Sequence, residues 1–250
     1  MSSKVFVVTG ANRGIGLSLV EHLSKEGEVI ATVRDASTVA NTPLSAFPNV
    51  KIVELEAESE ESIAKAAVEI EKLAPTGIDV LWNNIGVYNI SKSDSAVEKI
   101  KLDVLSREVV INAVSPVAVT VKLLPLLEKR DTRKVVFLSS LVSSVSTMGS
   151  MPQFITEYGL SYAYSASKSA QNAIVNFLNV QLQPKKFTIV SIHPGLVATD
   201  MMAQAMTQTA EVSGAITPDE SATGMIAVVD KLTAEDKYVL RDYAGNEYPF

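Results

Sequence analysis

Short apolar runs rich in valine and isoleucine recur along this chain of 250 residues, with helix-like segments between them. The first six runs do not alternate polar and apolar residues, which is typical of strands buried on both faces of a parallel sheet. The runs are Val5–Val8, Val29–Val33, Val50–Leu55, Ile78–Trp82, Val135–Leu138 and Phe187–Ile192, with a weaker seventh at Tyr238–Leu240. This alternation predicts an α/β fold, with a doubly wound sheet of seven parallel strands and helices on both faces.

No linker, change of composition or internal repeat divides the chain, so residues 1–250 are expected to form a single domain. Two stretches, Leu141–Leu160 and Ala198–Thr217, follow predicted strands and lack a clear strand or helix pattern. In an open α/β sheet, ligands bind beyond the carboxyl ends of the strands. We therefore expect residues of about 141–162 and 196–217 to line a substrate pocket; ordinary surface loops are the alternative.

The composition limits the partners that the protein can have. It has no cysteine and only two histidines, His22 and His193, so thiolate sites are excluded and no metal site is expected. A net charge of −6 and a pI of about 5.1 argue against nucleic acid and anionic membranes as partners. The run Val5–Val8 is too short for a signal sequence, and serines, Gly149 and Pro152 interrupt the longest uncharged stretch. We expect a cytoplasmic protein that binds a small molecule.

A glycine-rich segment, Thr9-Gly10-Ala11-Asn12-Arg13-Gly14-Ile15-Gly16, separates the first apolar run from a helical pattern. Glycines allow the backbone to approach a phosphate, and the N-terminus of a helix presents free N–H groups to an anion. The spacing Gly-x-x-x-Gly-x-Gly differs from that of a P-loop, which disfavours an ATPase. The residues expected to bind a cofactor here are Gly10, Asn12, Arg13, Gly14, Ile15 and Gly16; a purely structural turn is the alternative.

The end of the second apolar run indicates which dinucleotide binds. An acidic residue at this position would accept a hydrogen bond from the ribose of NAD, whereas arginine accommodates the 2′-phosphate of NADP. Here the run ends in Val33 and Arg34, and Arg13 supplies a second cation nearby. NADP(H) is therefore the expected cofactor, although either arginine alone could be a solvated surface charge.

Tyr164 and Lys168 are four residues apart in a segment with a helical pattern, so both side chains should lie on one helix face. A tyrosine that acts as an acid or base near neutral pH needs its pKa lowered by about three units, roughly 4 kcal/mol. An ammonium group about 5 Å away supplies roughly 3 kcal/mol at an effective dielectric constant of about 20. The pair is therefore a candidate catalytic unit, although Tyr-x-x-x-Lys also occurs by chance.

Together these residues resemble the short-chain dehydrogenase/reductase family, and the resemblance covers nearly the whole chain. The order and spacing of the motifs carry it: Thr9–Gly16, Asn83–Gly86, Asn112, Ser139–Ser140, Tyr164–Lys168, Pro194–Gly195 and Thr199. Arg34 and the C-terminal Ala244–Phe250 look like the carbonyl reductases of the sniffer and fungal benzil reductase type. The resemblance implies a Rossmann-like sheet and a reductase that uses NADPH to reduce small ketones or diketones.

The resemblance also implies a role for each matching residue. Tyr164 would protonate the carbonyl oxygen, Ser140 would hydrogen-bond the same oxygen, and Lys168 would hold the nicotinamide ribose and lower the pKa of the tyrosine. Ser139 is the alternative to Ser140. Asn112, at a helix kink, would anchor a water molecule of the proton relay. The further residues expected to contact the cofactor are Asn84, Glu56, Pro194, Gly195, Val197 and Thr199.

Several positions depart from the family pattern. Ile85 replaces the usual alanine, and Glu56 and Ala57 stand where aspartate or asparagine and valine are usual, which leaves the adenine contact open. The 23 residues between Ser140 and Tyr164 indicate an insertion at 144–162. Its apolar side chains, Met148, Met151, Phe154, Ile155 and Tyr158, are expected to form a pocket wall suited to aryl or alkyl ketones.

Two alternative functions stay open at this point. One is an alcohol or hydroxysteroid dehydrogenase that works in the oxidative direction with NAD(P), against which Arg34 and Val33 argue. Another is a non-catalytic protein that senses NADP(H), although such proteins usually lose the tyrosine or the lysine. A homodimer or homotetramer is also expected from the resemblance, because the helices that carry Asn112 and Tyr164 pair across subunits in many relatives. A monomer is the alternative, since monomeric members of the family exist.

Overall fold

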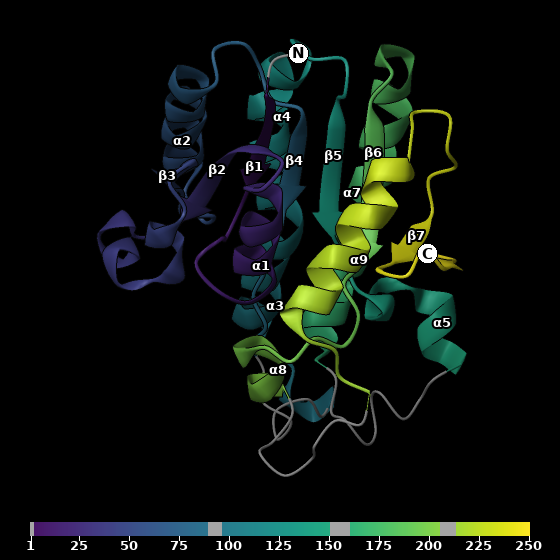
Figure 1. The fold of residues 1–250 in the computed structure, drawn as a ribbon. Coiled ribbons are helices and arrows are strands. Elements are labelled where there is room, and N and C mark those ends of the chain that lie inside the picture. The colour runs from purple at the N-terminus through teal and green to yellow at the C-terminus, as the bar shows by residue number, and fades with distance from the viewer. Residues whose placement is uncertain (1–2, 90–96, 151–160, 206–213) are drawn as a thin grey trace.

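A mostly parallel β-sheet forms the centre of the molecule (Figure 1). The computed structural model describes residues 3–89, 97–150, 161–205 and 214–250. The sheet has eight strands in the order β3-β2-β1-β4-β5-β6-β7-β8. Their bounds are β1 (Lys4–Val8), β2 (Gly27–Val33), β3 (Val50–Glu54), β4 (Val80–Asn83), β5 (Lys134–Leu138), β6 (Thr188–His193), β7 (Leu240–Asp242) and β8 (Glu247–Tyr248). The first seven strands run parallel, as predicted.

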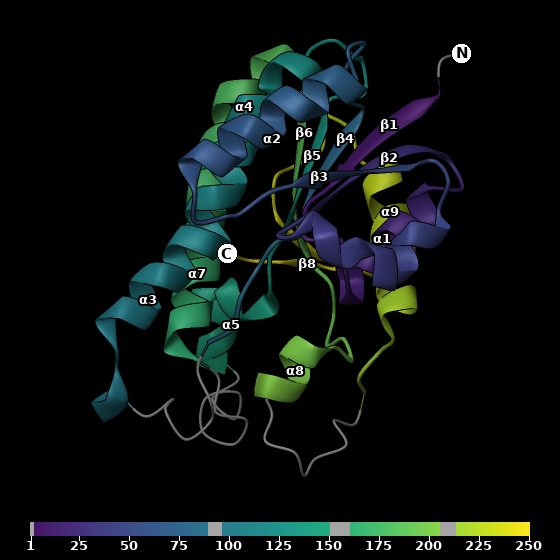
Figure 2. The ribbon, with the colours of Figure 1, turned by 90° about the vertical axis from the view of Figure 1, so that its left-hand side faces the viewer.

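Helices cover both faces of the sheet, which confirms the prediction of a doubly wound, Rossmann-like fold (Figure 2). On one face lie α1 (Gly14–Leu23) and α9 (Pro218–Lys231), and on the other lie α2 (Glu60–Leu73), α4 (Ser115–Leu127) and α7 (Tyr162–Leu182). Each layer has its own apolar core, because the strands bury their side chains on both faces. Within the described residues, the other α-helices are α3 (Leu102–Val109), α5 (Val145–Ser150) and α8 (Asp200–Ala205).

One long helical run combines three elements in sequence. Helix α3 continues through a π-helical turn at Val110–Val114 into α4. The run Leu102–Leu127 is long and apolar enough to cross a membrane by length and composition, and half of its most apolar window is buried inside the fold. A buried core helix satisfies the same criterion, and α3 and α4 pack against α7 and α2 respectively. The apolar composition of Leu102–Leu127 is therefore explained by its packing against α7 and α2.

The prediction of seven strands was wrong by one. The weak seventh run lies later than expected, at Leu240–Asp242, and an eighth strand, Glu247–Tyr248, pairs with it in the antiparallel direction. Asp242 stabilises this hairpin, because its carboxylate accepts hydrogen bonds from the backbone N–H of Ala244 and Asn246. A two-residue strand produces no periodicity in the sequence, so this hairpin could not be recognised from the pattern of apolar residues.

The order of the strands determines where a ligand can bind. Strand β1 pairs with β2 on one side and with β4 on the other, so the chain connections change direction between β1 and β4. Loops that leave the carboxyl ends of these two strands must diverge, and they open a crevice between them. Helix α8 lies beyond this edge of the sheet (Figure 1).

Candidate active site

A cleft of about 470 Å³ lies at the carboxyl edge of the sheet, at the point where the connections change direction. Segments that follow β1, β2, β3, β4, β5 and β6 all contribute to its walls. Of the residues predicted from the sequence, those that line it are Gly10, Asn12, Arg13, Gly14, Ile15, Gly16, Arg34, Glu56, Asn84, Tyr164, Lys168, Pro194 and Thr199. The fold thus brings most of the predicted site residues to one place.

The glycine turn has a backbone that other residues could adopt only with strain. Gly10 and Gly14 have φ of +67° and +54°, in the left-handed region that favours glycine. A Cβ atom at Gly16 would lie 2.3 Å from the Gly10 carbonyl oxygen, so this residue must also be small. The amide of Asn84 donates to the carbonyl oxygens of Thr9 and Gly10, each at 2.9 Å. Asn84 therefore holds the turn in place in addition to lining the cleft.

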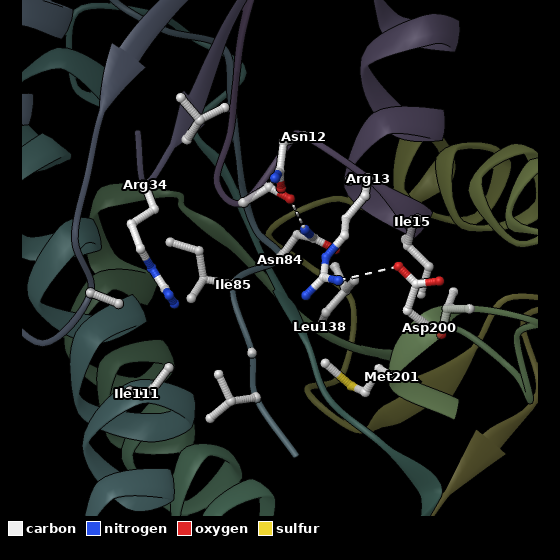
Figure 3. Close-up of a pocket in the computed structure, with 18 of the residues that line it drawn as sticks. Asn12, Arg13, Ile15, Arg34, Asn84, Ile85, Ile111, Leu138, Asp200 and Met201 are labelled. Atoms are coloured by element: carbon white, nitrogen blue, oxygen red, sulfur yellow. Dashed lines mark hydrogen bonds and ion pairs between the residues drawn. The ribbon is translucent and has the colours of Figure 1, made fainter. Parts of the chain in front are cut away.

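Ion pairs lie on two sides of the cleft. Figure 3 shows the pair of Arg13 with Asp200 on one side and Arg34 on the other. On one side Arg34, at the end of β2, forms a 3.0 Å ion pair with Glu56, which follows β3. On the other side Arg13 reaches Asp200 of α8 at 3.2 Å. The pairing of each predicted cation with a carboxylate could not be foreseen from the sequence, because the partners lie on loops distant in the chain.

The residues of the glycine turn and of Arg34 fit a dinucleotide phosphate. The first N–H groups of α1 lack partners within the helix, as at any helix N-terminus, and α1 begins within the glycine turn, at Gly14. A Cβ atom at Gly14 would come within 3.4 Å of the Thr199 methyl group, so glycine keeps the space between these two segments open. Arg34 supplies a planar donor group that is largely exposed.

Tyr164 lies in the first turn of α7, where Ser161 caps the helix by accepting a hydrogen bond from the Tyr164 N–H. Burial raises the pKa of the Tyr164 phenol above its usual value, and the charges of Glu108 and Tyr88 act in the same direction. A hydrogen bond with the Ser140 side chain opposes these effects. The polypeptide itself therefore keeps this phenol protonated, whereas the sequence had predicted a lowered pKa.

Lys168 is 3% exposed, and its ammonium group donates to the Leu138 carbonyl oxygen at 2.6 Å and to Gln171 Oε1 at 3.3 Å. The ammonium lies 5.9 Å from the centroid of the Tyr164 ring, so the predicted pair shares one helix face. Burial lowers the pKa of Lys168 to about 7, and the nearby Glu108 opposes this change. Lys168, which was expected to lower the pKa of Tyr164, therefore has a pKa close to neutral pH.

The two serines at the end of β5 differ in their partners. Ser139 lines the cleft, but its hydroxyl group donates to Asn172 Oδ1 at 2.8 Å, inside the protein. Ser140 is outside the cleft lining, yet its hydroxyl group hydrogen-bonds Tyr164. This geometry favours Ser140 over Ser139 as the partner of a group bound at the phenol.

Asn112 lies within the π-helical turn Val110–Val114, where a helix kink was expected. Its amide group donates to the Val87 carbonyl oxygen at 3.0 Å and to Ser167 Oγ at 2.9 Å, and its oxygen accepts from the Val87 N–H at 2.8 Å. Asn112 is fully buried and does not line the cleft. Its side chain fixes the segment that follows β4.

Some predicted residues do not reach the cleft. Gly195 is packed against Ile216 and Tyr243, and Val197 is buried and forms a bridge with Ile216. Within the predicted segment 196–217, the cleft is lined by Thr199, Asp200 and Met201. The described part of 141–162 contributes nothing to its lining, and Met151, Phe154, Ile155 and Tyr158 lie outside the described residues.

Three residues beside Tyr164 and Lys168 were not predicted from the sequence: Tyr88, Glu108 and Gln171. Glu108 precedes Asn112 by four residues and Gln171 follows Lys168 by three, so each shares a helix face with a predicted residue. This spacing was the signal that could have identified Glu108 and Gln171, whereas Tyr88 had no such signal. In the part of the chain that the structure describes, no group of three or more histidine, aspartate or glutamate side chains is placed to hold a metal ion.

Comparisons with known proteins agree with this geometry. The short chain dehydrogenase family model matches residues 4–210. An uncharacterized oxidoreductase of Schizosaccharomyces pombe is 39% identical over 262 aligned residues, which cover 100% of this chain and 99% of that protein. Among solved structures, the NADPH-bound carbonyl reductase from chicken fatty liver is similar with a TM-score of 0.87 and 27% identity, and covers 100% of both chains.

A further solved structure, the putative carbonyl reductase Sniffer of Caenorhabditis elegans, is similar with a TM-score of 0.80 and 26% identity, again over 100% of both chains. These likenesses extend over the sheet, the glycine turn and the segment that carries Tyr164 and Lys168, because they span the whole chain. The family model alone covers well over half of the sequence. The protein belongs to the short-chain dehydrogenase family.

Proposed function

We propose that this protein is an NADPH-dependent carbonyl reductase that converts small ketones or diketones into alcohols. One observation carries the proposal: the half-buried Tyr164, hydrogen-bonded with Ser140 and next to Lys168, lies in the same cleft as the glycine turn and Arg34. A proton donor and a nucleotide site that share one cleft are what the reduction of a carbonyl group requires.

The chain's own residues supply the proton and orient the substrate. When bound, reduced nicotinamide would supply a hydride to the carbonyl carbon. Ser140 and Tyr164 would both hydrogen-bond the carbonyl oxygen, and Tyr164 would transfer its proton to that oxygen as negative charge develops there. Lys168 would hold the ribose and, when protonated, stabilise the resulting tyrosinate. The phenol is protonated before the reaction because burial raises its pKa.

The choice of NADPH rests on Arg34. This guanidinium group is largely exposed at the carboxyl end of β2, where it can exchange Glu56 for a phosphate group. Val33 precedes it, so no acid stands at the end of the strand to bind an unphosphorylated ribose. The similar carbonyl reductase from chicken fatty liver was solved with NADPH bound, which supports the same preference.

The direction of the reaction is also proposed from the site. Oxidation of an alcohol needs a tyrosinate as base, and burial, Glu108 and Tyr88 all raise the pKa of Tyr164 and so oppose its ionisation. Reduction needs the protonated phenol, which these groups favour. The geometry thus supports reduction over the oxidative alternative.

The experiment that tests the proposal measures NADPH oxidation with a panel of aryl ketones, diketones and quinones, with identification of the alcohol products. We expect turnover with NADPH and a much weaker reaction with NADH. Tyr162→Phe is a matched control, because it removes a phenol two residues from Tyr164 whose oxygen accepts from the Lys101 N–H. NADPH binding with no turnover of any carbonyl compound would favour a protein that only senses the nucleotide.

We also propose that the protein forms a homodimer or homotetramer through the helices that carry Asn112 and Tyr164. The long helical run exposes Val110, Val114 and Val121, and α7 exposes Phe177 and Val180 at 64% and 66% of their surfaces. Exposed apolar side chains on packed helices are typical of association surfaces. Light scattering of the wild type and of Phe177→Asp tests the proposal: a monomer in both samples contradicts it.

A further inference from the structure

Glu108 is a fully buried carboxyl group, with 0% of its surface exposed, in the last turn of α3. One oxygen, Oε1, accepts a hydrogen bond from the Asn89 N–H at 2.6 Å. The other, Oε2, is buried and has no hydrogen-bond partner among the residues that the structure describes. Burial of a carboxylate with an unsatisfied oxygen costs free energy, so structural stability alone does not account for an acid at this position.

Glu108 and Asn112 both hold the segment that follows β4 in place by hydrogen bonds to its backbone. Both side chains project from the same helical run, four residues apart. Asn112 bonds the N–H and the carbonyl oxygen of Val87, and Glu108 bonds the N–H of Asn89. The residue between these two contacts is Tyr88, whose position is thus fixed on both sides.

Tyr88 in turn contacts Tyr164. The centroids of the two rings are 5.3 Å apart and the ring planes are inclined by 52°. The Tyr88 hydroxyl oxygen accepts a hydrogen bond from the Ser161 N–H at 2.9 Å, and Ser161 caps the helix that carries Tyr164. The contacts therefore form a continuous path from the Glu108 carboxyl group to the phenol of Tyr164.

The charge of Glu108 also affects the site, because it changes the pKa values of Lys168 and Tyr164. Burial raises the pKa of Glu108 to about 7, while hydrogen bonds with Asn89 and the charges of Arg107 and Lys168 oppose this change. An ionised Glu108 raises the pKa of Lys168 and of Tyr164. The titratable and charged groups that face it in the described residues are Arg107 on its own helix, Tyr88 after β4, and Tyr164 and Lys168 on α7.

We propose that Glu108 is a positioning residue for the reduction: its carboxyl group fixes Tyr88 against Tyr164 and, when ionised, keeps the proton on the phenol. The inference rests on the proposed function, because it assigns Tyr164 the role of proton donor. The consequence is that the site favours carbonyl reduction over alcohol oxidation. An ionised Glu108 opposes formation of the tyrosinate that alcohol oxidation needs, and it leaves the phenol ready for reduction.

The first test needs no turnover and uses the full chain with ¹³C at the tyrosine Cζ atoms. Lys168 also titrates near neutral pH, so it is replaced by methionine, or by glutamine if the methionine variant does not fold. In Lys168→Met, loss of the lysine charge raises the pKa of Glu108. We expect the Tyr164 resonance, assigned by its absence in Tyr164→Phe, to shift with a midpoint at or above about pH 7. In Glu108→Gln/Lys168→Met this step should disappear.

The second test separates position from charge. Glu108→Gln keeps an oxygen that can accept from the Asn89 N–H but removes the charge, whereas Glu108→Leu removes both. Asp103→Asn, an exposed acid on the same helix, is the matched control. With NADP⁺ and an alcohol, we expect the basic limb of the pH profile to move down by about one unit, or tenfold in rate at a given pH, in Glu108→Gln. Glu108→Leu should in addition raise KM for the carbonyl substrate severalfold, and Asp103→Asn should change neither.

Any of three results overturns the proposal. A Tyr164 resonance without a near-neutral step in Lys168→Met, or a step that persists in Glu108→Gln/Lys168→Met, shows that the carboxyl group does not act on the phenol. A pH profile that coincides in the wild type and Glu108→Gln does the same. If no carbonyl compound is turned over while the resonance behaves as expected, the proposed function fails and the coupling of Glu108 to Tyr164 stands.

Discussion

The two ends of the cleft hold their charges in opposite ways. At the glycine-turn end, Arg34 and Arg13 are 69% and 67% exposed, and each pairs with a carboxylate from a distant loop. At the other end Lys168, beside Tyr164, is 3% exposed, and Glu108, which acts on both residues from outside the cleft lining, is 0% exposed. The first set of charges faces water, and the second set is enclosed by the packing of α3 against α7.

This difference separates nucleotide recognition from proton transfer. An exposed ion pair contributes about 0 to 1 kcal/mol, so Arg34 can release Glu56 for a phosphate at little cost. Buried groups cannot exchange partners with water, so their environment changes their pKa values instead. We therefore expect substitutions at the open end to change which nucleotide binds, and substitutions at the buried end to change activity and its dependence on pH.

The largest effect is expected at the buried end from Tyr164→Phe. Loss of a general acid typically lowers the rate by 10²- to 10⁴-fold, so we expect kcat for carbonyl reduction to fall by about 10³-fold. The dissociation constant for NADPH, measured by fluorescence titration, should stay within about twofold of the wild type, because a ring of the same shape remains. Full activity in this variant would contradict the proposed mechanism.

A second substitution at the buried end tests stability. Folding raises the pKa of Glu108 from 4.5 to about 7, so the folded state holds its proton more tightly than the unfolded state does. This contribution to stability is complete below pH 4.5 and is lost as the pH rises through 7. Relative to Glu108→Gln, the wild type should therefore lose about 2 to 3 kcal/mol of unfolding free energy between pH 4.5 and 8.

Urea unfolding at several pH values measures this difference directly. The Asp103→Asn variant controls for the loss of one negative charge on α3. If the unfolding free energies of the wild type and Glu108→Gln run parallel over the whole range, the buried carboxyl group has no unusual proton affinity, and the contrast between the two ends is smaller than the structure indicates.

At the open end, Arg34→Ala should weaken NADPH binding. Hydrogen bonds to a charged group contribute about 1.5 to 3 kcal/mol, so we expect a 10- to 100-fold higher dissociation constant for NADPH. NADH lacks the 2′-phosphate and serves as the internal control, with a change of less than about threefold. Equal weakening for both nucleotides would show that Arg34 does not distinguish them.

The smallest effect is expected from Glu56→Gln, which removes the carboxylate that holds Arg34. Since a surface ion pair contributes at most about 1 kcal/mol, NADPH should bind up to fivefold more tightly. Isothermal titration calorimetry can resolve this gain. Weaker binding of NADPH would mean that Glu56 itself contacts the nucleotide, and that the pair with Arg34 does not compete with the phosphate.

Much of the fold could be predicted from the sequence, because strands buried on both faces appear as continuous apolar runs. The glycine turn and the pair Tyr164 and Lys168 could also be located, since each depends on spacing along a single element. The hairpin of β7 and β8 could not, because hydrogen bonds to Asp242 define it and its second strand is only two residues long.

The electrostatics of the site could not be predicted in the same way. The sequence indicated that Lys168 lowers the pKa of Tyr164, but the extent of burial depends on how α7 packs against α3 and the segment after β4. The spacing of Glu108 from Asn112 indicated a shared helix face, but the contact of Glu108 could not be predicted, because its partner is the backbone N–H of Asn89 and a backbone group has no signature in the sequence. Arg34 and Glu56 were both predicted as site residues, but their ion pair was not, because the two loops are distant in the chain.

The π-helical turn at Val110–Val114 adds a residue to the helix between Glu108 and the start of α4. An α-helix turns about 100° per residue, so deletion of one residue from this turn would rotate everything before it by about that angle. The apolar side chains of α4 would remain on the sheet, while the carboxyl group of Glu108 would move away from the Asn89 N–H that it bonds. Evolution can therefore alter proton chemistry here by a single-codon deletion that leaves the hydrophobic interior intact.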